Sequence, residues 1–290
     1  MDSKLGSLSI VIAAHNKAPI TELCLCSLLE LTFRPLEVIV VDNGSTDGTP
    51  ATLEAFGPIA EKVGILFRTV RLARNFGPIV ARNRAIHICH GEYIAFLDND
   101  VIIRSRGLFE RLIGHLREDQ RAGAVTPKFV YPCSPFRIQC AGGGITREGD
   151  CYLIGRGEER EKPEFNYVTC CPWTISACMV LSAELIRLIG PMDEVFNPIG
   201  CEDVDYCFRV RARNRQIVYR PDVEIYHIEN TTSFRTPTLN IQRAMKRSQR
   251  IIKRKWCHMF PVEPSTKELP LMHVPAPRVP LWTLRELPTL

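Results

Sequence analysis

Two carboxylates separated by one residue follow an apolar run in the first half of the chain. Residues 93–97 form the run, and Asp98, Asn99 and Asp100 come directly after it. In an extended backbone, side chains at positions i and i+2 point to the same side, so these two carboxylates can converge on one ligand. Such a pair can hold a divalent cation that keeps open positions for phosphate oxygens. Asp98 and Asp100 therefore predict a cation site, with a solvated loop as the alternative.

A second acidic group stands at Glu202, Asp203 and Asp205, directly after a Gly-Cys pair. The pattern of residues 202–210 predicts a helix, so these carboxylates crowd its first turn. Acidic groups there are stabilised by the helix dipole, an effect worth about 0.3–1 kcal/mol. A carboxylate in the same place can also accept the proton of an attacking hydroxyl group. The residues alone leave both roles open.

The elements around the first acidic pair alternate between strands and helices. An unbroken β-branched run predicts a strand buried on both faces at residues 36–42, and further strands are expected at residues 8–14, 65–71 and 93–97. Between them the sequence predicts a helix opened by Pro19, a short helix after Gly48 and a helix over residues 78–90. This alternation is typical of parallel β-α-β units and a covered sheet. Ligands of such sheets bind beyond the carboxyl ends of the strands, where Asp42 and the Asp98/Asp100 pair are expected.

Six segments match, in order, the motifs of family 2 glycosyltransferases. They are residues 10–16, 40–49, 75–77 with 81–83, 96–100, 173–179 and 200–205. The resemblance implies the α/β nucleotide-diphospho-sugar transferase fold called GT-A, with a mostly parallel Rossmann-like sheet flanked by helices. It also implies an inverting enzyme that moves a sugar from a nucleoside-diphosphate-sugar donor to a hydroxyl acceptor, in polysaccharide or glycoconjugate synthesis. Within the family, the chain resembles the rhamnosyltransferase-like branch.

The resemblance assigns the acceptor side of the reaction. Asp203 is the expected general base, and Glu202 orients the base or the acceptor, whereas Asp205 is expected to be structural. Trp173 is either a wall of the acceptor pocket, because aromatic faces bind sugar rings, or part of the core. The chain departs from the family at Ser176, where glycine is usual, and at the Ala-Ala pair of residues 13–14, where the family has Pro-Thr or Pro-Ser.

The resemblance also assigns the donor side. A Mg²⁺ or Mn²⁺ cofactor is expected on Asp100, with Asp98 and His227 beside it, and a hydrogen-bonded structural role is the alternative for His227. Asp42 is expected to read the nucleotide base. Arg82 is expected to pair with carboxylates or phosphate, or else to form an intramolecular ion pair. The expected donor-nucleotide site consists of Asp42, Asn16, Arg82 and Asp98.

The sequence divides into three parts. Residues 1–235 are predicted to form the catalytic domain, in which the glycine-rich segment 131–166 is an irregular insertion over the site. Residues 236–260 are predicted to form a basic amphipathic helix. Residues 261–290 are a proline-rich tail, which either lacks regular structure or packs on the domain. The side chains that could pack are Leu281, Trp282 and Leu284.

The net charge of +5 comes from one segment. Residues 243–255 carry seven lysines and arginines and no acidic residue, which leaves 30 basic against 32 acidic residues elsewhere. One interpretation is a helix that packs on the domain and leaves a solvated basic face. The other is peripheral contact between Arg243–Lys255 and anionic lipid headgroups, which would bring the site to a lipid-linked glycan acceptor.

Two other functions compete with sugar transfer. A metal-dependent sugar nucleotidyltransferase shares the sheet and the metal carboxylates but has no need of a carboxylate base. A non-catalytic nucleic-acid-binding protein would depend on the basic segment alone and leaves the six motifs unexplained, so no nucleic acid is expected as a partner. Residues 1–9 lack the pattern of a signal peptide. The expected location is therefore cytoplasmic, either free or peripheral at the inner face of the membrane.

Overall fold

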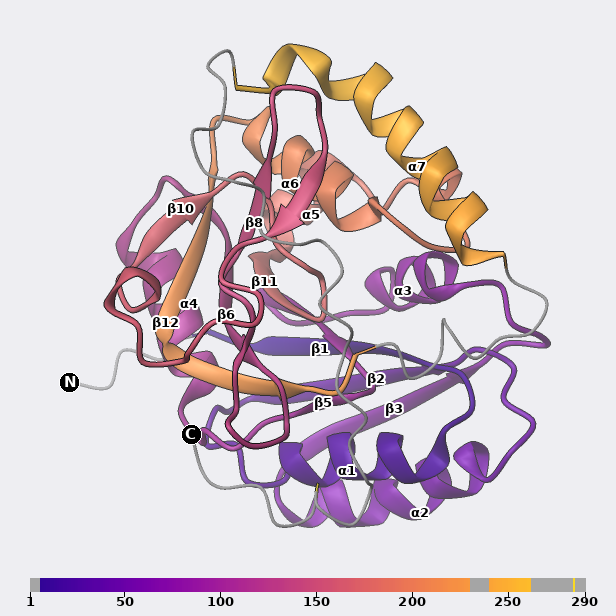
Figure 1. Cartoon of the computed structure of the whole chain (residues 1–290). Coiled ribbons are helices and arrows are strands. Elements are labelled where there is room, and N and C mark those ends of the chain that lie inside the picture. Colours follow the sequence, from indigo (N-terminus) through magenta and orange to yellow (C-terminus); the bar gives the residue numbers. More distant parts are fainter. Residues whose placement is uncertain (1–5, 230–239, 262–283, 285–290) are drawn as a thin grey trace.

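A computed structural model describes residues 6–229, 240–261 and 284 of the chain. The centre is a ten-stranded sheet in the order β10-β12-β6-β11-β4-β1-β2-β3, with β5 paired to β12 and β7 paired to β6. Helices cover both faces (Figure 1). The sheet strands are β1 Leu8–Ala14, β2 Leu36–Asp42, β3 Ile65–Arg71, β4 Tyr93–Asp98, β5 Val101–Ile102, β6 Ala122–Val130, β7 Ile138–Cys140, β10 Thr169–Cys171, β11 Cys178–Ser182 and β12 Gln216–His227.

Two hydrophobic cores lie on the two faces of the sheet. Helices α1, α2 and α4 supply side chains to one core, and α3, α5, α6 and α7 to the other. The alternation of β1 separates them, because Ile10 and Ile12 belong to the first core and Val11 to the second. The helices are α1 Ala18–Leu28, α2 Thr49–Lys62, α3 Pro78–Ile86, α4 Leu108–Glu118, α5 Ala183–Ile189, α6 Glu202–Arg211 and α7 Ile241–Trp256.

The predicted α/β architecture with a largely parallel sheet is confirmed. Strand β1 pairs in parallel with β2 on one side and with β4 on the other, and β2 pairs in parallel with β3. The register places Asp42 opposite Ala14 and Asp98 opposite Ala13. Both acidic residues therefore end their strands at the same edge of the sheet, on either side of β1.

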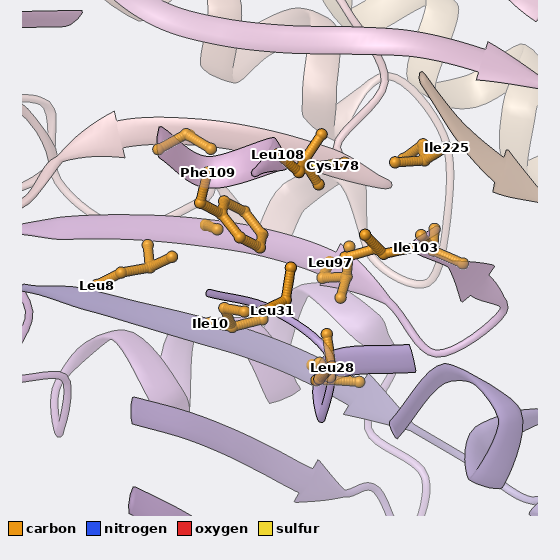
Figure 2. Close-up of a cluster of buried hydrophobic side chains, with 14 of the residues drawn as sticks. Leu8, Ile10, Leu28, Leu31, Leu97, Ile103, Leu108, Phe109, Cys178 and Ile225 are labelled. Atoms are coloured by element: carbon orange, nitrogen blue, oxygen red, sulfur yellow. The ribbon is translucent and has the colours of Figure 1, made fainter. Parts of the chain in front are cut away.

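Apolar packing fixes the turn that carries the acidic pair. Leu97 precedes this turn, Ile103 follows it, and both belong to the first core together with Ile225 of β12. Figure 2 shows Leu97 and Ile103 close together in this cluster, with Phe109 of α4 packed beside Leu97. Because these side chains are at most 3% exposed, the backbone at residues 98–102 is held by the core.

Two predicted elements have different bounds in the structure. Helix α3 ends at Ile86 rather than His90, because Glu37 accepts a hydrogen bond from the backbone N–H of His90 (3.0 Å) and Ser9 accepts one from Gly91 (2.8 Å). These side chains of β1 and β2 replace the helical bonds. The β-branched and aromatic residues of 223–227 also predict a strand, and this segment is the last part of β12, which begins at Gln216 and shifts its register between Arg220 and Glu224.

The segment 131–166 is more regular than the sequence suggests. It contains β7, which joins the main sheet, and a two-stranded sheet of β8 Gly143–Ile145 and β9 Cys151–Leu153. A 3-10 helix, η1 Pro163–Phe165, follows. Strands of three residues are too short to give a period-2 pattern, which explains the expectation of irregular structure.

Helix α7 packs on the domain through buried residues that include Ile252 and Trp256. Among the described residues, no helix combines the length and the apolar character needed to cross a membrane. Most of the proline-rich tail, including Leu281 and Trp282, lies outside the described residues. Leu284 is described and is fully buried beside α1, β5 and β12.

Candidate active site

Asp98, Asp100 and His227 converge at the edge of the sheet. His227 Nε2 lies 3.2 Å from Asp100 Oδ1 and 3.8 Å from Asp98 Oδ2, and the three ligand atoms lie within 4.8 Å of one another. Pairing of β5 with β12 sets His227 opposite Val101, and the backbone N–H of Ile228 donates to the carbonyl of Asp100 (3.0 Å). The backbone thus brings together residues that are more than 120 positions apart.

These three residues, the cation corner, fit a divalent metal ion. Two carboxylates and one imidazole nitrogen form a donor set that suits Mn²⁺. The electrostatics of the site also favour a bound cation. Burial lowers the pKa of His227, but the Asp100 and Asp98 carboxylates have the larger effect and raise that pKa to about 9. The cation corner therefore favours a positive charge at His227 Nε2, as a metal-binding site requires.

Arg82 of α3 connects the cation corner to the next part of the site. Its guanidinium forms an ion pair with Asp98 and donates to the hydroxyl of Ser176 (3.0 Å). The side chain of Arg82 is 4% exposed and that of Asp98 is 33% exposed. The structure thus shows the intramolecular ion pair, and Ser176, where the family has glycine, holds the arginine.

Glu202 and Asp203 begin α6 beside Arg82. Burial and the neighbouring Glu202 carboxylate raise the pKa of Asp203 to about 8, against an opposing effect of Arg82. Burial also raises the pKa of Glu202, where Arg82 opposes the shift and Asp98 adds to it. The charges of Arg82 and Asp98 therefore act on the carboxylates at the start of α6. Both side chains keep part of their surface exposed.

Asparagines hold the loop that leads into α6. Asn83 donates to the carbonyl of Met192 and accepts from its backbone N–H, both at 2.9 Å. Asn197 donates to the carbonyl of Phe76 (2.7 Å), and glycine at position 77 leaves room for it, since a Cβ there would lie 2.0 Å from Asn197 Oδ1. The turn that carries Glu202 and Asp203, the carboxylate turn, is therefore attached to α3, which also carries Arg82.

Asp42 lies at the other side of β1. Its Oδ1 accepts from the backbone N–H of Ser45 (2.9 Å), and its buried Oδ2 lies 3.6 Å from Arg71 without a hydrogen bond. A buried carboxylate oxygen in this state is ready to accept from a ligand N–H. A cavity of about 450 Å³ lies beside this turn, lined by Gly44, Ser45, Thr46, Arg71, Leu72 and Ala73.

Asn16 holds the same turn from the end of β1. Its side-chain oxygen accepts from the backbone N–H of Thr46 (2.8 Å), and its own backbone N–H donates to the hydroxyl of Ser45 (2.8 Å). The backbone of Asn16 adopts a φ of 58°. The structure therefore shows Asn16 shaping the wall of the cavity.

Trp173 is in the core, the second of the two alternatives for this residue. It is 5% exposed, and its indole N–H donates to the carbonyl of Gly144 (2.7 Å). Glycine at position 143 makes room for the ring, since a Cβ there would lie 2.2 Å from it. Trp173 therefore attaches the 131–166 segment to the sheet.

Asp205 is fully buried on the side of α6 that faces α7. It accepts from the indole N–H of Trp256 (2.8 Å) and pairs with Lys255 (2.8 Å) and Arg209 (3.1 Å). Its role is thus the expected structural one, since it joins α6 to α7. Of the three carboxylates in this turn, Glu202 and Asp203 are the ones on which Arg82 acts.

Sequence reasoning missed three polar residues that position the site, Gln139, Asn83 and Asn197. Gln139 accepts a hydrogen bond from His227 Nδ1 at 2.7 Å. Asn83 stood inside a recognised motif without a role, and Asn197 stood in an unassigned loop. No spacing in the sequence reveals these contacts, because each joins segments more than 80 residues apart.

Comparison with known proteins gives a consistent result. A model of "Glycosyl transferase family 2" matches residues 9–175. The uncharacterized protein y4gI of Sinorhizobium fredii is 30% identical over 260 residues, which cover 86% of this chain and 27% of that protein. The pre-mycofactocin glycosyltransferase of Mycobacterium tuberculosis is 29% identical over 224 residues, which cover 77% of this chain and 43% of that protein. The chain thus spans less than half the length of these two relatives.

The fold has a counterpart among solved structures. The mannosyltransferase PcManGT from Pyrobaculum calidifontis superimposes with a TM-score of 0.57 at 18% identity, covering 78% of this chain and 58% of that one. The motif order, the sheet topology and the family match agree with one another. The chain belongs to glycosyl transferase family 2 and has the GT-A fold.

Proposed function

We propose that this protein transfers a sugar from a nucleoside-diphosphate-sugar donor to a hydroxyl group of an acceptor, with inversion at the anomeric carbon. The observation that carries the proposal is the position of Arg82. This side chain pairs with Asp98 of the cation corner, and its charge acts on Glu202 and Asp203. A site for a departing diphosphate and a site for an attacking hydroxyl are therefore adjacent.

The donor is assigned to the edge of the sheet around β1. Asp42 accepts from the nucleotide base beside the 450 Å³ cavity, with Asn16 supporting its wall, and Arg82 and Asp98 complete the donor site. The cation corner would hold Mn²⁺ or Mg²⁺, and the imidazole nitrogen would favour Mn²⁺. When bound, the ion offsets the negative charge that grows on the departing diphosphate. PcManGT was solved in complex with GDP-Man and Mn²⁺, which supports this donor class.

The acceptor is activated by Asp203. Its carboxylate takes the proton of the acceptor hydroxyl while the oxygen forms a bond to the anomeric carbon, and the bonding pair of the broken bond leaves with the nucleoside diphosphate. The raised pKa of Asp203 makes it a stronger base than an ordinary aspartate. Glu202 stays fixed beside it, because its carboxylate accepts from the backbone N–H of Gly200 (2.8 Å).

We further propose that the acceptor is a lipid-linked glycan at the inner face of a membrane, as in polysaccharide or glycoconjugate synthesis. Three basic residues of α7 bind the protein itself: Arg247 donates to Val195, Lys253 pairs with Asp150, and Lys255 pairs with Asp193 and Asp205. The side chains of the other four are exposed, form no hydrogen bond or ion pair with described residues, and follow one side of the helix. This basic stripe consists of Arg243, Lys246, Arg250 and Arg254.

The position of the basic stripe connects it to the acceptor side of the site. Helix α7 crosses the domain next to α6 (Figure 1), where Ser248 donates to Ile199 (3.3 Å) in the loop before the carboxylate turn. A membrane that binds the basic stripe would thus lie near Asp203. Each cation near an anionic surface contributes about 1 kcal/mol.

Vesicle flotation tests the membrane contact. Wild-type protein is expected to float with vesicles that contain anionic lipid and to stay behind with neutral vesicles. A triple variant, Arg243→Gln with Lys246→Gln and Arg250→Gln, is expected to lose flotation. The control triple, Lys62→Gln with Arg187→Gln and Arg213→Gln, removes as much exposed charge elsewhere and should float normally. Equal flotation of the two triples would contradict the contact.

Product analysis tests the reaction itself. Nucleoside-diphosphate sugars are incubated with the protein and Mn²⁺ and with glycan or lipid-glycan acceptors, and the released nucleotide is identified. Release of nucleoside diphosphate together with a glycosylated acceptor supports the proposal. Formation or consumption of pyrophosphate would assign the protein to the nucleotidyltransferases instead. Thermal-shift measurements with nucleoside diphosphates, with and without Mn²⁺, select the donors to test.

A further inference from the structure

Gln139 is an amide in an apolar setting. It lies between Ile138 and Cys140 on β7, which pairs with β6, and its side chain is 1% exposed. Burial of an amide costs stability unless hydrogen bonds replace its contacts with water. The amide of Gln139 makes three such contacts, and two of them are to His227.

The contacts of the amide determine its orientation. The Gln139 N–H group donates to the backbone carbonyl of His227 (3.2 Å) and to a carboxylate oxygen of Glu229 (3.3 Å), and both partners can only accept. The amide oxygen must therefore face His227 Nδ1 at 2.7 Å. An amide oxygen cannot donate, so the hydrogen of this bond belongs to Nδ1. When His227 is neutral, as a metal ligand must be, its lone pair is therefore on Nε2 and is directed to the cation corner.

A second group of residues holds the amide in place. Arg156 binds both carboxylate oxygens of Glu229, with contacts of 3.0 Å and 3.1 Å, and Tyr131 donates to the same carboxylate at 3.2 Å. Arg156 and Tyr131 belong to the 131–166 segment, as Gln139 does. This segment therefore reaches the cation corner through a continuous chain of contacts from Arg156 through Glu229 and Gln139 to His227.

We propose that Gln139 is a positioning residue of the metal centre, which fixes the His227 tautomer that leaves Nε2 available to the ion. The 131–166 segment is then a structural part of the metal centre as well as a cover over the sheet. The proposal rests on the proposed function only for the presence of the ion. Partners that orient a metal-ligating histidine in this way typically change metal affinity by about 10–100-fold.

A double-mutant cycle on Mn²⁺ affinity tests this proposal. Binding of Mn²⁺ alone is measured by electron paramagnetic resonance of the free ion, in the wild type, in Gln139→Met, in His227→Asn and in the double variant. Methionine keeps the length of the side chain but accepts no comparable hydrogen bond. Gln139→Met is expected to weaken Mn²⁺ binding by about 10–100-fold. In the His227→Asn background the same change should have no further effect, because its target is gone.

Circular dichroism and thermal unfolding check that each variant is folded. If Gln139→Met does not fold, Arg156→Met is measured instead. This variant removes the side chain that holds Glu229, which in turn contacts Gln139. A smaller loss of Mn²⁺ affinity is expected from it, again only while His227 is present. Equal losses with and without His227 would assign Gln139 a merely structural role and overturn the inference.

The same experiment separates this inference from the proposed function. A wild-type protein that binds Mn²⁺, with His227→Asn weakening the binding and Gln139→Met leaving it unchanged, refutes the inference alone. If neither the wild type nor His227→Asn binds Mn²⁺, the metal centre is refuted as well.

Discussion

The guanidinium of Arg82 is held between the carboxylate of Asp98 and the hydroxyl of Ser176. Asp98 ends β4, where the cation corner lies, and the charge of Arg82 also acts on Glu202 and Asp203 at the start of α6. The two carboxylate groups of the proposed reaction therefore share one buried positive charge. We therefore expect this arginine to couple the metal site to the base.

The Arg82–Asp98 pair should contribute measurably to stability. Arg82→Met leaves the Asp98 carboxylate without its partner, and we expect the free energy of unfolding to fall by about 1–3 kcal/mol, because Asp98 is partly exposed. Urea unfolding measures this loss. The double variant with Asp98→Asn removes the lone charge and should recover part of the stability. Strictly additive losses would mean that the two side chains do not interact.

The requirement for metal should depend on Asp100. With Asp100→Asn, the Mn²⁺ concentration for half-maximal activity is expected to rise at least about tenfold, because a neutral amide binds a hard cation more weakly. Activity is measured over a Mn²⁺ titration. The control is Asp222→Asn, which removes a surface carboxylate that pairs with Arg220. A shift of the same size in this control would show that general charge, rather than the cation corner, sets the requirement.

Donor recognition should depend on Asp42. Asp42→Asn keeps an oxygen for the N–H of Ser45 but loses the charged acceptor beside the cavity. We expect KM for the donor to rise about tenfold, as a charge-assisted hydrogen bond of about 1.5 kcal/mol is lost, with kcat little changed. Steady-state kinetics with varied donor measure both constants. An unchanged KM would remove Asp42 from the donor site.

Part of this architecture is readable in the sequence, and part is not. The strands of residues 8–14, 36–42 and 65–71 are found where predicted. Apolar runs mark the first two, which are buried along almost their whole length, whereas only the first residue of the third is buried. The assignment of Asp42 and Asp98 to the ligand site then follows from the rule that ligands bind beyond the carboxyl ends of the strands. Local pattern suffices for these features.

Strand β6 shows a feature that the local sequence pattern cannot predict. It is buried along its whole length although it contains Thr126, Pro127 and Lys128. The ammonium group of Lys128 can be buried because Glu224 pairs with it (3.0 Å), and the carbonyl of Arg160 (3.1 Å) and the side-chain oxygen of Asn166 (2.5 Å) accept from it. Gln139 and Asn83 are of the same kind, since their partners come from distant segments. Polar residues whose burial depends on tertiary partners carry no signal in the sequence.

Stability should depend on pH in a way that identifies Asp203. Its folded-state pKa lies above its ordinary value of 3.8, so the ionised carboxylate destabilises the fold, and stability is lost as the pH rises through the folded-state pKa of about 8. Asp203→Asn cannot ionise. Its melting temperature relative to wild type should therefore increase between about pH 5 and about pH 9.

Asp193 provides the control of opposite sign. Burial works against its charge, but Lys255 and the N–H of Val195 outweigh this effect and hold the pKa of Asp193 below its ordinary value. Its stabilisation is present above the unfolded-state pKa and is lost in acid, so Asp193→Asn should melt earlier than wild type over the same range. Thermal unfolding at several pH values measures both variants. A constant difference for Asp203→Asn would contradict the raised pKa.

The turnover of Asp203→Asn under saturating donor and Mn²⁺ tests the proposed reaction most directly. The central claim is that carboxylates far apart in the chain form one site, in which a cation binds the donor while Asp203 activates the acceptor. We predict that the variant binds Mn²⁺ and nucleoside diphosphate like wild type while kcat falls by about 10²–10⁴-fold. Glu184→Gln, which removes a carboxylate from the first turn of α5, should keep full activity. Wild-type turnover by Asp203→Asn would contradict the account.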